Sequence, residues 1–211
     1  MKTFAKSILR FLSLVTVLPA VVAFRLQTGL VGRDKAFPGW SQLFSLIPGL
    51  VGVYLRNAFY SCCLTRCGRD ACVSFGTILS HPDTQIGQTA YLGNYCSIGN
   101  ARIGSDVLIA SHVSVMNGCH QHGIERLDIP VREQTGHYPV VTIGDDSWIG
   151  ERAVVAADIG RHCVIGAGAL VISPIPDYAV AVGVPARIIG DRRELSRRPD
   201  QAQRRSGTSH V

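Results

Sequence analysis

The sequence predicts an all-β solenoid with a protruding loop, preceded by an apolar, helical N-terminal segment. An aliphatic residue followed by a small one recurs about every six residues, which is typical of a solenoid. A long stretch without this pattern separates two runs of the repeat, and two apolar stretches precede the first run. The repeating pairs are Ile86-Gly87, Leu92-Gly93, Ile98-Gly99, Ile103-Gly104, Ile109-Ala110, Ile143-Gly144, Ile149-Gly150, Ile159-Gly160 and Ile165-Gly166.

Each repeat unit is expected to form one short strand and one turn. The aliphatic residue points inward, and the small residue after it suits a tight corner. Three units close a triangular coil of about eighteen residues, and coils must stack because one coil cannot bury its apolar edge. The units from Ile98 to Ile103 and from Val155 to Ile159 are short, which indicates local distortion or a shift of register. A β-sandwich would instead show period-two alternation.

Residues 1–70 are apolar and are expected to be helical. Residues 11–24 carry no charge, but a bilayer-spanning helix needs about 20 apolar residues, and this run is interrupted by Pro19. The second apolar run, residues 43–55, is also interrupted, and residues 37–40 between the runs indicate a turn. We therefore expect a segment that caps the solenoid or lies in the membrane interface, with basic residues at the headgroups. These basic residues are Lys2, Lys6, Arg10 and Arg25.

The formal net charge of +6 is concentrated at the two ends of the chain. Residues 191–211 hold six arginines with few apolar residues, which predicts a solvated, disordered tail. This tail has no aromatic interleaving and no recognition motif, so no nucleic-acid partner is expected. Attraction to anionic lipid is the favoured role for the charge.

The cysteines indicate reduced thiols in a cytosolic protein, since there are seven of them and they are scattered along the chain. Four lie close together, but their spacing lacks the Cys-x2-Cys pair of a zinc site, so no metal is expected. These four are Cys62, Cys63, Cys67 and Cys72.

The stretch of about residues 116–141 breaks the aliphatic period, so it is expected to leave the coil as a loop. A loop of this length in a tight solenoid is usually functional. It contains His120 and His122, and histidine suits general-base catalysis because much of it is neutral near pH 7. Cys119 beside them is an alternative nucleophile, but adjacent side chains rarely face each other correctly.

Three features together resemble the hexapeptide-repeat acyltransferase family, O-acetyltransferase branch, over about residues 73–189. They are the histidine-bearing insert, the segment Thr142-Ile-Gly-Asp-Asp-Ser-Trp-Ile-Gly after it, and the closing Ala181-Val-Gly-Val-Pro-Ala-Arg. The resemblance implies a left-handed parallel β-helix over residues 71–190 and a homotrimer with its active site between subunits. It also implies direct transfer of an acyl group, most simply acetyl, from acetyl-CoA to a hydroxyl, with a histidine base and no acyl-enzyme.

The resemblance also implies roles for individual residues. His122, which is followed by Gly123, matches the family's catalytic histidine best, and His120 is the alternative. Glu125 or Asp128 could orient the imidazole. The residues that match the family's coenzyme A path are Trp148, Gly150, Glu151, Ala167, Gly168, Pro185, Ala186 and Arg187, the last reaching the nucleotide phosphates.

The favoured acceptor is a sugar hydroxyl in a surface-polysaccharide or glycolipid precursor, handled in the cytoplasm or at the inner face of the membrane. Serine acetylation is an alternative, but that branch carries a long polar helical N-terminal domain, unlike this apolar segment. A zinc-dependent carbonic anhydrase on the same scaffold would need histidines where residues 151–156 have none. A non-catalytic solenoid scaffold is the remaining alternative.

Overall fold

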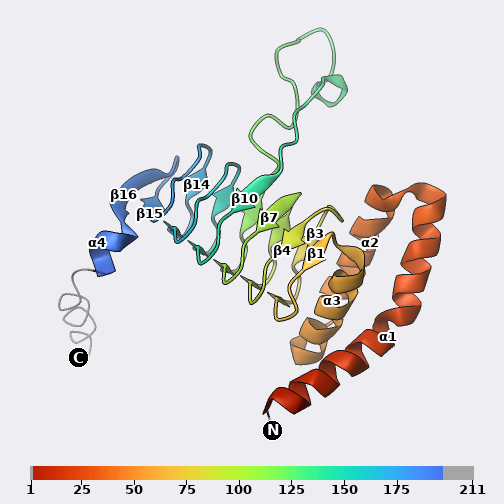
Figure 1. Ribbon diagram of the computed structural model, residues 1–211. Helices are drawn as coiled ribbons and strands as arrows, with labels where there is room; N and C mark the ends of the chain where they lie inside the picture. The colour runs from red at the N-terminus through yellow and green to blue at the C-terminus, as the bar shows by residue number, and fades with distance from the viewer. Residues whose placement is uncertain (1, 197–211) are drawn as a thin grey trace, which may run out of the picture.

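The computed structural model describes residues 2–196 as helices at both ends of a β-helix (Figure 1). Three helices precede the coils, and a short one follows them. These are α1 (Lys2–Val31), α2 (Arg33–Ser45), α3 (Gly49–Cys63) and α4 (Arg192–Ser196). Residues 197–211, most of the predicted tail, lie outside the described residues.

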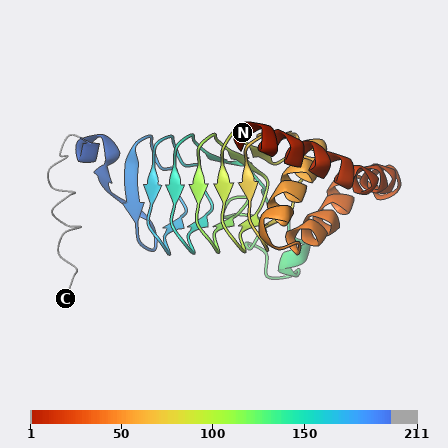
Figure 2. The same cartoon turned by 90° about the horizontal axis from the view of Figure 1, so that it is seen from below.

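The coils form three faces, each a stack of short strands that pair in parallel except at the C-terminal end (Figure 2). Face A consists of β1 (Arg66–Cys67), β4 (Gln85–Ile86), β7 (Ala101–Ile103) and β10 (Val141–Ile143). Face B consists of β2 (Cys72–Val73), β5 (Tyr91–Leu92), β8 (Leu108–Ile109), β11 (Trp148–Ile149), β13 (Val164–Ile165), β15 (Ala179–Val182) and the antiparallel β16 (Arg187–Asp191). Face C consists of β3 (Ile78–Leu79), β6 (Ser97–Ile98), β9 (Ser114–Val115), β12 (Val154–Val155) and β14 (Leu170–Val171).

The aliphatic repeat residues are in register and form the core, as the sequence predicts. On face B, Ile149 pairs with Ile109 on one side and with Ile165 on the other, and all three are at most 1% exposed. Burying each such side chain contributes about 1.5–3 kcal/mol. The coils begin at β1, a few residues before the predicted start at residue 71.

The small residue after each aliphatic one is required for a different reason from the one predicted. A Cβ at Gly87 would lie 2.4 Å from the backbone carbonyl carbon of Gly104 in the next coil, which is closer than atoms can approach. The backbone takes the left-handed conformation two residues later, at Thr89 (φ 58°) and Asp106 (φ 59°). The small residue therefore allows close stacking of coils, and its neighbour makes the corner.

The short repeat units are explained by one corner of variable length, between faces C and A. Ile98 ends β6 on face C and Ile103 ends β7 on face A, so the short unit spans this corner. Val155 and Ile159 flank the same corner two coils further on, and Ile159 still pairs with Ile143. The long loop leaves here too, between β9 and β10, and contains the 3-10 helix Val131–Glu133.

The predicted turn at residues 37–40 is wrong, because these residues lie inside α2. Tertiary packing overrides the local Pro-Gly signal: Phe37 is fully buried against Phe24 of α1 and Tyr60 of α3. Helix α1 extends well beyond the first apolar run and continues through Pro19. By length and composition alone, Lys6–Val31 is long and apolar enough to cross a membrane.

Helices α2 and α3 cover the first coil and satisfy its free backbone groups. Ser41 accepts a hydrogen bond from the Leu79 N–H at 2.9 Å. The buried Arg56 donates from Nε to the Val73 carbonyl at 2.7 Å and from a terminal nitrogen to Ile47 at 2.7 Å. Burial lowers the pKa of Arg56. The end of the stack is therefore closed by side chains that provide the missing hydrogen bonds.

We expect Gly87→Ala to destabilise the β-helix, because the new methyl group would force two coils apart; overpacking of this kind costs about 1–3 kcal/mol. Gly39→Ala is the control, since Gly39 lies in α2 with no atom within 4 Å of a built Cβ. Urea unfolding followed by circular dichroism measures both variants. A Gly87→Ala midpoint equal to that of the wild type would show that close stacking does not explain the glycine.

Candidate functional site

The predicted donor-binding residues begin on face B and continue around the corner between faces B and C. Trp148 in β11 projects outward from face B, with 53% of its surface exposed. Gly150 and Glu151 follow at the corner, where Gly150 is buried and Glu151 is exposed. The indole is therefore free to contact a ligand or a neighbouring subunit.

The next coil places its own predicted residues directly beside this corner. The Gly168 N–H donates to the Glu151 carbonyl at 2.8 Å. A Cβ at Gly150 would lie 2.4 Å from the Ala167 nitrogen, so the two coils touch through backbone alone. Ala167 and Gly168 are exposed, so the corner presents a surface of backbone and small side chains that an extended chain can approach.

The closing segment of the β-helix carries the remaining predicted residues. Ala186 donates from its backbone N–H to the Leu170 carbonyl at 2.8 Å, which ties the segment to face C. Pro185 and Arg187 are exposed beside it. Among residues 2–196, no carboxylate pairs with Arg187, so its guanidinium is available for a phosphate.

The loop that carries the predicted base is fixed at its neck by Asn117, a residue that the sequence analysis did not single out. Its side-chain amide donates to the carbonyls of Asn100 at 3.3 Å and Pro139 at 3.2 Å. Its Oδ1 also accepts from the Asn100 N–H at 3.3 Å, and Gly99 leaves the space that this requires. One buried amide thus joins both arms of the loop to the preceding coil.

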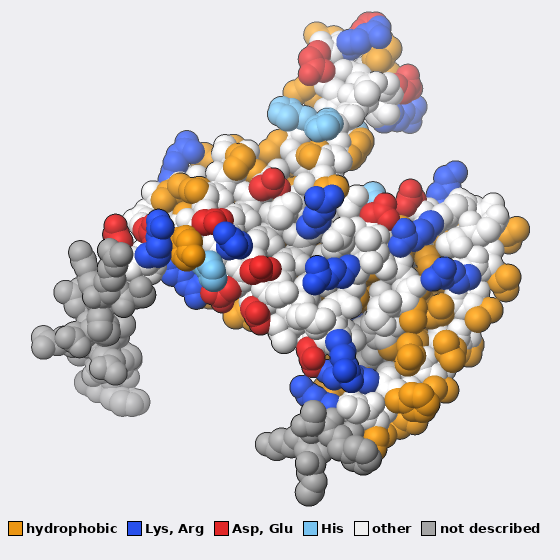
Figure 3. Space-filling view, in the orientation of Figure 1, with side chains coloured by type: hydrophobic (Ala, Val, Ile, Leu, Met, Phe, Trp, Pro, Cys, Tyr) orange, Lys and Arg blue, Asp and Glu red, His pale blue; other side chains and the backbone are white. Residues whose placement is uncertain are grey.

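Histidines gather just above this neck, where pale-blue side chains cluster in Figure 3. The His137 N–H donates to the His120 carbonyl at 2.8 Å, so the two arms of the loop run side by side. The ring of His122 meets the edge of Tyr138, with 6.2 Å between centroids. All three histidines are exposed. The contact between the two arms brings His137, which the sequence analysis did not single out, to the same place.

The carboxylates suggested as orienting groups do not reach a histidine in the described part of the chain. Asp128 pairs with Arg126, whose Nε donates to it at 2.9 Å. Glu125 accepts the Ile124 N–H at 3.0 Å. Both carboxylates therefore make their hydrogen bonds to other residues of the loop. Within residues 2–196, the imidazoles of His120 and His122 have no hydrogen-bond partner.

The loop and the donor corner lie at opposite ends of face C in one chain. The corner at Gly150 and Glu151 precedes β12, whereas the loop follows β9, the strand that pairs with β12. A single chain therefore separates the predicted base from the predicted donor path by the length of a face C strand.

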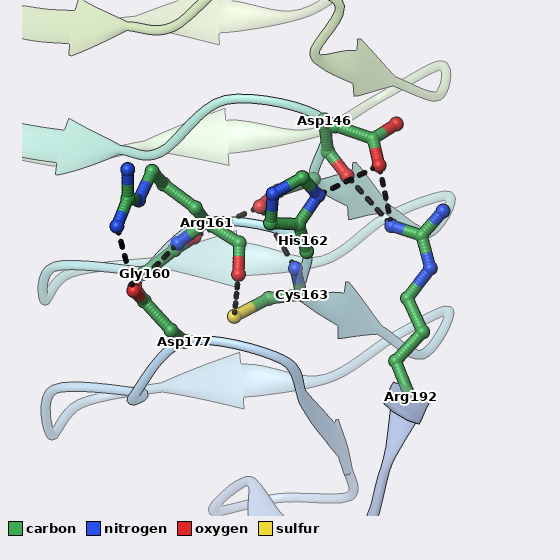
Figure 4. Close-up of polar contacts among 8 residues, drawn as sticks. Asp146, Gly160, Arg161, His162, Cys163, Asp177 and Arg192 are labelled. Atoms are coloured by element: carbon green, nitrogen blue, oxygen red, sulfur yellow. Dashed lines mark hydrogen bonds and ion pairs between the residues drawn. The ribbon is translucent and has the colours of Figure 1, made fainter. Parts of the chain in front are cut away.

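A histidine–carboxylate pair does occur elsewhere, at the corner between faces A and B (Figure 4). His162 Nδ1 lies 2.9 Å from Asp146, and Arg192 of α4 donates to the same carboxylate at 2.9 Å. The hydrogen bond from His162 and the charge of Arg192 lower the pKa of Asp146. His162 also stacks on Tyr178 of the next coil, so this cluster fastens the C-terminal segment to the coils.

The seven cysteine thiols lie in different environments. All seven are free, and among the described residues no three His, Cys, Asp or Glu side chains are placed to hold a metal ion. Burial raises the pKa values of Cys63 and Cys67 to about 12, which keeps both thiols protonated. Cys119 is exposed beside the histidines.

Several proteins named as acetyltransferases are similar to this chain. A protein described as an O-acetyl transferase of lipopolysaccharide biosynthesis in Escherichia coli is 33% identical over 54% of this chain and 60% of its own length. The galactoside O-acetyltransferase of E. coli is 37% identical over 46% of this chain and 45% of its own length. The serine acetyltransferase of Haemophilus influenzae is 29% identical over 74% of this chain and 58% of its own length. The chain is therefore similar in sequence to these acetyltransferases over about half to three quarters of its length.

Solved structures share this fold. A maltose O-acetyltransferase from Clostridium difficile 630 matches with a TM-score of 0.66 and 23% identity over 77% of this chain and 87% of that one. A galactoside acetyltransferase in complex with coenzyme A matches with the same TM-score and identity, over 78% of this chain and 83% of that one. The predicted left-handed parallel β-helix is confirmed. No protein-family model matches, and the chain spans less than two thirds of the length of the three relatives found by sequence.

We expect Asn117→Ala to loosen the neck of the loop, because it removes hydrogen bonds to both arms; losing a buried hydrogen bond costs about 1–3 kcal/mol. Trypsin cleavage at the exposed Arg126 and Arg132 should accelerate severalfold, while the coils remain folded. Asn94→Ala, at an exposed corner position, is the control. Equal cleavage rates in the two variants would contradict the role given to Asn117.

Proposed function

We propose that this chain is a coenzyme A-dependent O-acyltransferase that transfers acetyl to a hydroxyl of a sugar, in a surface-polysaccharide or glycolipid precursor. The observation that carries the proposal is the pair of exposed imidazoles, His120 and His122, at the neck of a loop that leaves a hexapeptide β-helix. The relatives named for lipopolysaccharide biosynthesis and for galactoside support a sugar acceptor. The donor corner supports binding of an extended pantetheine arm.

In the proposed reaction, the neutral imidazole of His122 accepts the proton of the acceptor hydroxyl. The hydroxyl oxygen forms a bond to the thioester carbonyl carbon, and the carbon–sulfur bond then breaks. The imidazolium returns its proton to the departing thiolate, so His122 ends neutral. A backbone N–H of the corner stabilises the developing oxyanion. Because the thioester is already activated, the chain provides no nucleophile, and Cys119 has no part in the reaction.

A homotrimer is part of the proposal, and two observations support it. The loop and the donor corner lie at opposite ends of face C in one chain, so a loop from one subunit would meet the corner of the next. Face B also exposes a ladder of apolar side chains suited to a neighbouring subunit. Three consecutive parallel strands contribute Tyr91 (39% exposed), Leu108 (51%) and Trp148 (53%).

Serine acetylation is the second candidate, and the similarity to the H. influenzae enzyme over most of this chain favours it. The apolar α1 argues for an acceptor close to a membrane instead. Serine is therefore included among the acceptors in the kinetic test. Turnover of serine alone would move the proposal to that class.

Calorimetry with coenzyme A and acetyl-CoA tests the donor without knowledge of the acceptor. We expect micromolar binding by the wild type and about tenfold weaker binding by Arg187→Ala, because a phosphate would lose a charged hydrogen bond. Arg102→Ala, an exposed arginine on face A, is the control and should bind like the wild type. No binding by a folded wild type would leave the non-catalytic scaffold as the better description.

Steady-state kinetics with sugar acceptors tests the base. We expect His122→Ala to lower kcat by a factor of about 10² to 10⁴, with little change in the KM for acetyl-CoA, because general-base catalysis contributes this much. His81→Ala, outside the loop, is the control. If His120→Ala causes the large loss and His122→Ala does not, the base is His120.

A further inference from the structure

Helix α1 exposes a continuous apolar stripe on the face turned away from the rest of the protein. Orange side chains follow this helix along the outer edge of the molecule (Figure 3). Its residues recur at helical spacing, so they lie on one side. They are Phe11 (65%), Val15 (47%), Leu18 (48%), Val22 (56%), Leu26 (69%) and Leu30 (86%).

The stripe widens where α3 begins. Leu50 and Val51, both 67% exposed, line an apolar groove together with Leu9 and Leu12 of α1. Leu43 and Leu46, at the end of α2 and just beyond it, are also more than half exposed. An exposed apolar surface of this extent marks a site of interaction with a protein or a membrane.

The opposite face of α1 is bound to the protein along its length. Val17 and Phe24 are buried, and Phe24 packs against Phe37 and Phe59 of the neighbouring helices. Arg25 donates to the Cys62 carbonyl at 3.1 Å. A helix that crossed a bilayer would have to leave these contacts or carry α3 and the first coil into hydrocarbon. One packed face and one apolar face fit a helix that lies in the membrane interface.

The charge of the residues around the stripe indicates what the stripe binds. Residues 1–69 hold nine Lys or Arg and one acidic residue, Asp34. The exposed Arg69 lines a cavity of about 430 Å³ with Phe11 and Leu14, so positive charge borders the stripe. Lys6 and Arg10 lie nearby and share Asp70 as their partner. The same basic surface on a second copy would be repelled, whereas anionic lipid headgroups would be attracted.

We propose that α1 and the start of α3 dock this protein on the surface of an anionic lipid bilayer, with the stripe in the acyl boundary and the basic residues at the headgroups. Seven free cysteines fit the reducing side of the membrane, so the docking face is that of the cytoplasmic leaflet. Docking holds the protein beside amphiphilic acceptors. It does not depend on the proposed reaction.

Vesicle sedimentation with the full chain tests the proposal. We expect wild-type protein to bind phosphatidylcholine vesicles that contain one quarter phosphatidylglycerol, and to bind pure phosphatidylcholine much more weakly. Leu18→Glu with Val22→Glu should weaken binding more than tenfold, because both side chains would leave the acyl boundary. Leu127→Glu, at a loop residue that is 98% exposed, is the matched control and should bind like the wild type.

Arg69→Gln should weaken binding to the anionic vesicles about fivefold, and added salt should do the same. Circular dichroism checks that each variant is folded. Absence of wild-type binding, or equal binding by the stripe variant, would overturn the proposal. So would protein that resists a pH 11 carbonate wash, which indicates a spanning helix, or a stripe variant that changes oligomeric state but not vesicle binding.

Discussion

The parallel stacking of coils at backbone contact distance is the constraint on which the rest of this structure depends. Each coil donates and accepts backbone hydrogen bonds with the coils on either side, and at the corners the two backbones touch where a Cβ would not fit. This arrangement buries the aliphatic column and leaves little freedom at two corners of the triangle. It confines variation in length to the third corner, between faces C and A, where the long loop leaves.

A stack of this kind has two open ends, and the chain closes them differently. At the start, α2 and α3 supply Ser41 and Arg56 to unpaired backbone groups of the first coil. At the other end, β16 turns back antiparallel on β15, and Arg192 fastens the segment to Asp146. Helix α1 completes the first cap through aromatic packing, and its other face remains apolar. A capping element thus also provides an interaction surface.

The candidate site combines elements that a regular repeat cannot provide. The coils supply a donor corner of small residues and backbone, which follows from the stacking itself. The proposed base is carried on a loop whose neck depends on Asn117 and on a contact between its two arms. Since loop and corner lie at opposite ends of face C, the proposed site would be complete only between subunits. In that proposal, a protein with so regular a core depends on assembly for its chemistry.

The sequence by itself determined the β-helix, its inward residues and the place where the loop leaves, because these follow from the six-residue repeat, which can be read from neighbouring residues. It did not determine that residues 37–40 are helical or that α1 continues through Pro19, because long-range aromatic packing overrides local signals there. Nor did it show that Glu125 and Asp128 are occupied within the loop, or that His137 lies beside His120. These contacts join residues far apart in the chain or depend on loop geometry, which only the tertiary structure decides.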